Sequence, residues 1–272
     1  MPIKRQLEGY RRDDPPPVPQ LAVPITVPEY CCEVGLASTS AKIQATGDLI
    51  IIAFYYLLRC GEYTAPRLVK RSDGSWQRAT RTKQFTVNDI GFWRNGRMLR
   101  RTSPLSLLLQ ADSATLKITN KQNGKMGQTI HHETFSSPLS PIKALARRVN
   151  HILSNGGSPI SLLSEYYEAP LQSFFTVTPL DLITSLRLAV AALKLDEAGI
   201  DPMLIGVHSL RAGGAMALKL NGVSDTIIMK MGRWSSLTFL MYIHNQIGHL
   251  STDLSAKMRT RTPFLNIAAI EP

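Results

Sequence analysis

Five side chains spread along the chain have the types needed to cut a phosphodiester bond without a metal ion. In chain order they are Arg59, Lys121, His208, Arg211 and Tyr242. A tyrosine hydroxyl can attack phosphorus and form a covalent ester, while two guanidinium groups bind the non-bridging oxygens. A histidine can take or share a proton, and a lysine can deliver one to the leaving 5′ oxygen. This set of side chains is sufficient for phosphoryl transfer through a tyrosyl ester.

Three of the five residues lie in one stretch, residues 207–243. His208 and Arg211 are three residues apart at the start of a helical pattern. The pattern stops at an Asn-Gly pair, which is a good C-cap, and restarts after Ser224, which is a good N-cap. The stretch therefore predicts two short helices, followed by a third that carries Tyr242.

Each of these residues also has a plainer explanation. Arg59 follows a buried helix, and a cation at that end can simply interact favourably with the negative C-terminal end of the helix dipole. His208 and Tyr242 could be ordinary core residues. A chance match is nevertheless improbable, because five such elements would have to fall in the right order.

The sequence lacks the common signatures of metal and nucleotide chemistry. It contains no Gly-x-x-x-x-Gly-Lys-Ser/Thr loop, no His-Glu-x-x-His pair and no zinc-spaced set of Cys and His. No cluster of Asp and Glu looks able to hold two magnesium ions. We therefore expect neither a metal nor a nucleotide cofactor.

The balance of charge favours a polyanionic partner. The 272 residues carry 31 Lys and Arg against 20 Asp and Glu, a formal net charge of +11, which favours nucleic acid before an anionic membrane. The longest apolar run, residues 49–58, falls short of the roughly 20 residues that span a membrane. No secretory signal is evident. The three cysteines fit a reducing compartment and ordinary packing.

The pattern predicts a mainly helical α+β chain with a small antiparallel sheet near residues 65–132. Residues 1–39 read as a Pro-rich arm, and the proline density over residues 1–30 predicts an extended segment without a helix. A nearly all-apolar helix over Ser40–Leu58, closed by Gly61, belongs in the middle of the domain. Further helices are predicted over residues 140–153 and 178–193.

Two strand-like runs, Ala114–Ile118 and Gln128–His131, flank an Asn-Gly turn and predict a hairpin. Lys121 and Lys125 lie on either side of the turn, where a lysine usually faces solvent. Upstream, residues 65–101 interleave basic and aromatic side chains, which suits contacts with a nucleic-acid backbone. An exposed sheet edge protected by positive charge would have a similar composition.

Four segments resemble the catalytic domain of tyrosine recombinases, the site-specific recombinase and phage integrase superfamily. They are LLRCGEYT, the Lys-bearing hairpin, HSLRAGGA and GRWSSLTFLMYI. The resemblance covers residues from about 40 to 250 and is most specific at the His-Ser-Leu-Arg and Tyr segments. The residues of these motifs are most similar to those of eukaryotic mobile-element members, the DIRS-like and Crypton-like recombinases.

The resemblance implies a role for each residue. The catalytic set would be Arg59, Lys121, His208, Arg211, Trp234 and Tyr242, with Glu62 as the supporting acid. Tyr242 would be the nucleophile and Lys121 the general acid of the hairpin. Trp234 would donate a hydrogen bond to a phosphate oxygen.

Two assignments stay open. Relatives often show the hairpin residues Lys121-Gln122 in the reverse order, which leaves Lys125 as an alternative general acid. Family members commonly place a His or Trp nine residues before the Tyr. Here Arg233 stands at nine and Trp234 at eight, so either can fill that position.

The implied activity is site-specific recombination or integration on duplex DNA through a 3′-phosphotyrosyl intermediate. Residues 40–272 would form the catalytic domain, with the family's N-terminal core-binding domain absent. Family members work as tetramers on paired sites, and a mobile-element origin implies the nucleus, or the cytoplasm if the source is prokaryotic. The alternatives are a catalytically inactive DNA-binding remnant and a type IB topoisomerase-like activity.

Overall fold

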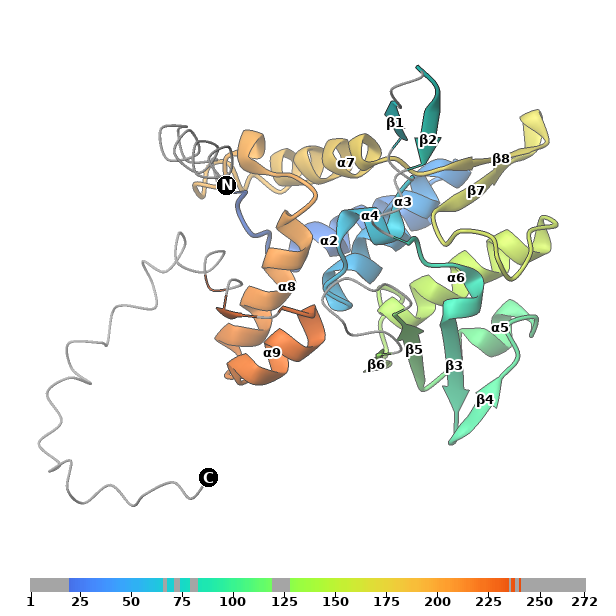
Figure 1. The fold of residues 1–272 in the computed structure, drawn as a ribbon. Coiled ribbons are helices and arrows are strands. Elements are labelled where there is room, and N and C mark those ends of the chain that lie inside the picture. Colours follow the sequence, from blue (N-terminus) through green and yellow to red (C-terminus); the bar gives the residue numbers. More distant parts are fainter. Residues whose placement is uncertain are drawn as a thin grey trace, which may run out of the picture.

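The computed structural model describes residues 20–65, 68–70, 74–78, 83–118, 128–234, 236–237 and 240. They form an α+β fold with a small antiparallel sheet (Figure 1). The helices are α2 (Thr26–Ala37), α3 (Ala41–Tyr55), α4 (Cys60–Tyr63), α5 (Leu105–Leu108), α6 (Pro141–Ser154), α7 (Pro179–Ala192), α8 (Ser209–Leu220) and α9 (Asp225–Gly232). The strands are β1 (Leu68–Lys70), β2 (Trp76–Arg78), β3 (Ile90–Arg94), β4 (Arg97–Leu99), β5 (Ser113–Lys117), β6 (Thr129–Glu133), β7 (Glu165–Glu168) and β8 (Ser173–Thr176). None of the helices in this part of the chain is long and apolar enough to cross a membrane.

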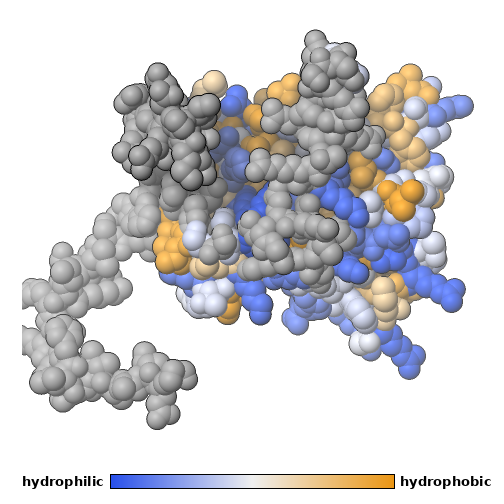
Figure 2. All heavy atoms as spheres, viewed as in Figure 1, coloured by the Kyte–Doolittle hydropathy of each residue, from blue (hydrophilic) through white to orange (hydrophobic). Residues whose placement is uncertain are grey.

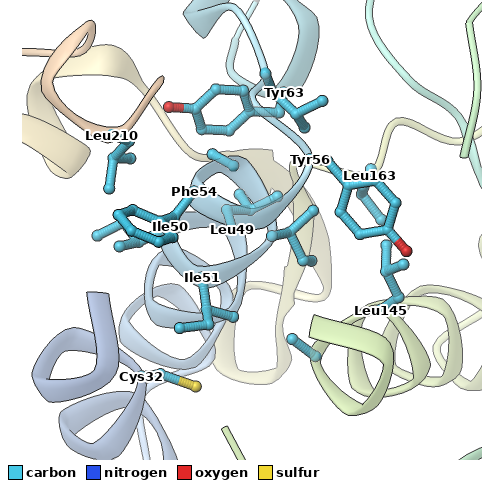
Figure 3. Packing of buried hydrophobic residues seen from close by; sticks show 14 of the residues in the cluster. Cys32, Leu49, Ile50, Ile51, Phe54, Tyr56, Tyr63, Leu145, Leu163 and Leu210 are labelled. Carbon is cyan, nitrogen blue, oxygen red and sulfur yellow. The ribbon is translucent and has the colours of Figure 1, made fainter. Parts of the chain in front are cut away.

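Helix α3 is the centre of the core, as its all-apolar pattern predicts. Every residue from Ala45 to Phe54 is buried. Figure 3 shows the α3 side chains among α2, α6 and α8, to which Cys32, Leu145 and Leu210 belong. Fully burying one large apolar side chain is worth about 1.5–3 kcal/mol, so this helix supplies a large share of the stabilising burial.

One ion pair lies on the inner side of this apolar helix. Asp48 is 5% exposed, and Arg147 of α6 donates to its Oδ1 through Nε at 2.8 Å and Nη2 at 2.5 Å. Burial raises the pKa of Asp48, and the Arg147 guanidinium opposes that shift. Because a buried carboxylate needs such a partner, the pair ties α6 to α3.

Helix α8 packs on the end of α3 through two glycines. A Cβ on Gly214 would overlap the carbonyl oxygen of Phe54, and one on Gly213 would overlap the carbonyl oxygen of Val23. Only a residue without a side chain allows the backbones to approach this closely. The approach brings Arg211, one turn earlier on α8, to the end of α3.

The expected hairpin is confirmed in a four-stranded sheet of order β4-β3-β5-β6. Strand β5 pairs antiparallel with β6, with Lys117 opposite Thr129 at the end nearest the turn. The turn itself, with Lys121 and Lys125, lies outside the described residues. Strand β4 forms one edge of the sheet, and its Arg97 is exposed, which fits the edge-protection interpretation. Hydrophilic residues gather over β3 and β4 in Figure 2.

The expectation of an extended segment over residues 1–30 is wrong at its end, because α2 begins at Thr26. Pro28 lies in the first turn, where a missing N–H costs no intrahelical hydrogen bond. Helix α2 buries Val27 and Cys31 in the core formed with α3. The Pro-rich composition therefore does not separate this part of the chain from the core.

The end of α3 also differs from the prediction of a cap at Gly61. The helix ends at Tyr55, and Gly61 lies inside the separate short helix α4. Between them Leu57 takes a left-handed conformation with φ of 49°, which costs a residue with a side chain about 1–2 kcal/mol. Packing offsets this cost, because Leu57 is fully buried in a small cluster with Ile228 and Trp234.

The unpredicted hairpin β7–β8 is attached to α6 through His151. The Tyr167 backbone N–H donates to His151 Nε2 at 2.9 Å, so this nitrogen carries no proton. Burial and the neighbouring Arg148 lower the pKa of His151 to about 4. Arg148 itself donates to the carbonyl oxygens of Leu163 and Glu165.

We expect acid to destabilise the fold through His151. Its pKa is about 4 in the folded protein, below the ordinary 6.5, so folding favours the neutral ring. The stabilisation of the fold by the neutral His151 ring is complete above about pH 6.5 and is lost as the pH falls towards the pKa of His151 in the folded protein. Urea unfolding between neutral pH and pH of about 4 measures it. His151→Gln should weaken the pH dependence of the free energy of unfolding, whereas Ser154→Ala should leave it as in the wild-type protein. If this free energy changes equally with pH in the wild type and both variants, His151 is not the group responsible.

Gly214→Ala should destabilise the protein although alanine normally favours a helix by up to about 1 kcal/mol over glycine. The added methyl group meets the Phe54 carbonyl oxygen, and relieving such overpacking costs about 1–3 kcal/mol. Leu220→Ala, at a side chain 58% exposed on the same helix, should stay within about 0.5 kcal/mol. Thermal or urea unfolding compares the two, and a stabilised Gly214→Ala protein would show that α8 does not approach α3 as described.

Candidate active site

Arg59 and Glu62 lie at the start of α4, where the chain leaves the end of α3. The Arg59 backbone N–H donates to Glu62 Oε2 at 2.8 Å, and Arg59 Nη1 lies 3.6 Å from Glu62 Oε1. Arg59 Nη2 also donates to the carbonyl oxygen of Arg233 at 3.3 Å. A cation at a helix N-terminus gains nothing from the dipole of that helix. Arg59 also lies three residues beyond Tyr56, the C-cap of α3, so its contacts with Glu62 and Arg233 account for its position better than the dipole of α3 does.

Arg211 reaches the same place from the first turn of α8. Its Nη1 donates to the carbonyl oxygen of Leu57 at 2.7 Å, and its Nη2 donates to the carbonyl oxygen of Gly232. The Trp234 ring covers the guanidinium, with 4.0 Å from Cζ to the ring centroid, a distance typical of a cation–π contact. Arg211 is consequently 4% exposed.

Arg233 lies at the end of α9 and forms a buried ion pair with Glu62. The distance from Nη2 to Glu62 Oε2 is 2.6 Å, and the side chains are 2% and 0% exposed. Burial lowers the pKa of Arg233 and Glu62 opposes that shift. Arg59 and Arg233 thus share one carboxylate, so that the described residues of the cluster, Arg211 included, carry more positive than negative charge.

His208 lies one turn before Arg211, at the N-cap of α8. Its backbone N–H donates to Gln20 Oε1 at 3.0 Å, while the residue as a whole is exposed. Partial burial and the Arg211 charge lower the pKa of His208. The ring is therefore neutral at pH 7 and able to accept a proton.

Two of the predicted catalytic residues, Lys121 and Tyr242, lie outside the described residues, as does Lys125. Described residues nevertheless flank the lysine hairpin on both sides and precede Tyr242 at residue 240. Gln128 Nε2, at the base of the lysine hairpin, donates to the carbonyl oxygen of Lys230 in α9 at 3.2 Å. Leu240 packs against the cluster that contains Leu57 and Trp234.

The structure thus brings together Arg59, Glu62, Arg211 and Trp234, with His208 one helical turn away. The cluster also contains Arg233, whose role the sequence left open. Sequence reasoning missed the carbonyl oxygens of residues 57, 232 and 233, which orient the guanidinium groups. No side-chain signal identifies these carbonyls, because any residue type supplies one. Their positions follow from the left-handed turns at 57 and 233.

Chemically, the cluster is suited to an anion that takes several hydrogen bonds. Guanidinium groups oriented by backbone carbonyls bind phosphate oxygens with defined geometry. Among the described residues, no group of three His, Cys, Asp or Glu side chains lies close enough together to bind a metal ion.

We expect Arg233→Met to destabilise the protein by about 3–5 kcal/mol, because it leaves the Glu62 carboxylate buried without its closest partner. Adding Glu62→Gln in the same chain removes that charge and should recover most of the loss. The matched control is Lys219→Met, which breaks a pair with Asp225 whose side chains are both 35% exposed and which should cost at most about 1 kcal/mol. Urea unfolding measures all three. Equal losses at Arg233 and Lys219 would show that the Glu62 pair is not buried.

Comparison with known proteins does not place the chain in a family. No protein-family model matches the sequence, and no curated protein matches it. The resemblance to tyrosine recombinases rests on the motifs of the chain itself.

Proposed function

We propose that the chain is a DNA strand transferase of the tyrosine recombinase type. The observation that carries the proposal furthest is the meeting of Arg59 and Arg211, which lie far apart in the sequence. Backbone carbonyls of the two turns at residues 57 and 232–233 bind both guanidinium groups. Donors oriented before the substrate arrives stabilise developing charge without reorganisation at the moment of reaction. Such a pair suits the non-bridging oxygens of a phosphodiester.

In the proposed reaction, Tyr242 attacks the phosphorus and forms a 3′-phosphotyrosyl ester while the bond to the 5′ oxygen breaks. His208, neutral at pH 7, takes the tyrosine proton. Lys121 or Lys125 gives a proton to the leaving 5′ oxygen. Attack by a 5′ hydroxyl on the ester reverses these steps and rejoins a strand, so the bond energy is conserved in the protein–DNA link.

Two contacts support the placing of the undescribed residues in this reaction. The hydrogen bond from Gln128 to Lys230 holds the base of the lysine hairpin against α9, which ends at Gly232 beside the arginine cluster. The packing of Leu240 against Leu57 and Trp234 brings the chain to the same cluster two residues before Tyr242.

Duplex DNA is the proposed substrate, and the net charge of +11 supports it, because each phosphate contact releases counterions and favours binding at low salt. Assembly into a tetramer on paired sites and location in the nucleus remain predictions of the resemblance alone.

A DNA-binding protein without catalytic activity is the second candidate. The observation that favours it is the burial of Arg211, whose guanidinium donates to two backbone carbonyls beneath the Trp234 ring. An arginine held in this way stabilises the fold whether or not a phosphate binds.

The decisive measurement is a trapping assay with nicked suicide duplexes of varied sequence, which release a short fragment after cleavage and prevent rejoining. We expect a protein–DNA adduct whose tryptic peptide contains Tyr242. Tyr242→Phe should abolish the adduct and keep DNA binding, because it removes the attacking oxygen alone. Arg59→Ala should lower the rate of adduct formation by about 10²–10³-fold.

The outcomes separate the candidate functions. Salt-sensitive DNA binding without any adduct would favour the non-catalytic protein. An adduct accompanied by relaxation of supercoils, but by no joining between two sites, would favour a type IB topoisomerase. An adduct that persists in Tyr242→Phe would show that another residue is the nucleophile.

A further inference from the structure

Arg233 occupies an unusual position for an arginine. It follows α9 with φ of 58° and ψ of 37°, the left-handed conformation that glycine or asparagine usually takes after a helix. The turn is tight, because a Cβ on Gly232 would overlap carbon atoms of the Trp234 ring. This turn places the Trp234 ring over Arg211. It also directs the Arg233 side chain towards Glu62.

Arg233 contributes to both contacts that orient Arg59. Its carbonyl oxygen accepts a hydrogen bond from Arg59 Nη2 at 3.3 Å. Its Nη2 lies 2.6 Å from Glu62 Oε2, the same oxygen that accepts the Arg59 backbone N–H at 2.8 Å. Movement of Arg233 would therefore change the position of the carbonyl and the carboxylate together.

The two arginines differ in their access to a ligand. The Arg59 side chain is 23% exposed, whereas that of Arg233 is 2% exposed. Burial alone does not exclude a phosphate ligand, since Arg211 is 4% exposed. What sets Arg233 apart is its pair with Glu62, which is 0% exposed, because moving the Arg233 guanidinium towards a phosphate would take the closest partner away from a buried carboxylate. Arg59 can contact a phosphate without breaking this pair.

We propose that Arg233 is a positioning residue and not a phosphate ligand: with Glu62 it holds Arg59 where Arg59 binds the scissile phosphate. The inference rests on the proposed function and deepens it. It assigns the position nine residues before Tyr242 to the support of Arg59, and it assigns Trp234 to the covering of Arg211.

A double-mutant cycle on the rate of adduct formation tests the coupling. Arg233→Gln and Glu62→Gln should each slow the reaction by about 10–100-fold, by analogy with residues that orient the ligands of a metal site. If both act through the same contact, the double variant should be no slower than the slower single variant. Effects that multiply would overturn the proposal, because Arg233 would then act on the phosphate independently of Glu62. Lys219→Gln is the control with an exposed ion pair, and adduct formation at saturating DNA separates the chemical step from binding.

Chemical labelling of the unmodified protein provides a readout that does not require activity or a folded variant. Phenylglyoxal reacts with accessible guanidinium groups, and mass spectrometry locates the products. Arg59 should react in the free protein and be protected by duplex DNA, whereas Arg233 should resist in both states. If Arg233 is labelled in the free protein and duplex DNA prevents this labelling, Arg233 is a phosphate ligand and the proposal is overturned. The proposal is also overturned if duplex DNA does not reduce the labelling of Arg59.

The two experiments fail separately. If the wild-type protein forms no Tyr242 adduct, the proposed strand-transfer activity fails, and the labelling pattern alone decides whether Arg59, and not Arg233, contacts the phosphates in a DNA-binding protein. If the adduct forms and the effects of Arg233→Gln and Glu62→Gln multiply, the activity stands and the positioning role is wrong.

Discussion

The ion pair between Glu62 and Arg233 is the interaction on which the rest of the site depends. It joins α4, which follows the central helix, to the end of α9, more than a hundred and fifty residues later in the chain. Desolvating both charges is expensive, and a buried pair is therefore retained only where good geometry offsets the cost. The carboxylate also accepts the Arg59 backbone N–H and lies 3.6 Å from the Arg59 guanidinium, so one buried acid contacts three groups at once.

The packing of the helices explains why the arginines meet at this point. Helix α3 buries every residue from Ala45 to Phe54 and ends at Tyr55, two residues before the buried, left-handed Leu57, whose carbonyl oxygen faces Arg211. Helix α8 can deliver Arg211 to that oxygen because Gly213 and Gly214 let its backbone approach α3 closely. The second left-handed turn, at Arg233, supplies the remaining carbonyls. Apolar burial thus places the helices, and the two turns then orient the guanidinium groups.

The sequence predicted those features that a local pattern encodes. The apolar helix α3, the proline-led helix α6, the capped helix α7 and the β5–β6 hairpin all follow from periodicity and caps. The prediction was wrong where tertiary packing overrides local preference: Thr26 begins a helix within proline-rich sequence, and Leu57 rather than Gly61 takes the turn. The resemblance to tyrosine recombinases grouped Arg59, Glu62, Arg211 and Trp234, yet it could not distinguish Arg233 from Trp234, because their roles depend on the direction of a single turn.

The charge of the cluster follows from this geometry. Within the described part of the chain, Arg59 and Arg233 contact one carboxylate and Arg211 lies against backbone carbonyls, so the described acidic groups offset the positive charge only in part. Carbonyl dipoles and the Trp234 ring reduce the repulsion among guanidinium groups without neutralising them. An anion that enters such a site is stabilised by charges already in place and in turn stabilises the folded state that holds them. The same arrangement that makes the cluster costly to bury therefore also suits it to an anion, which is the property that the proposed function requires.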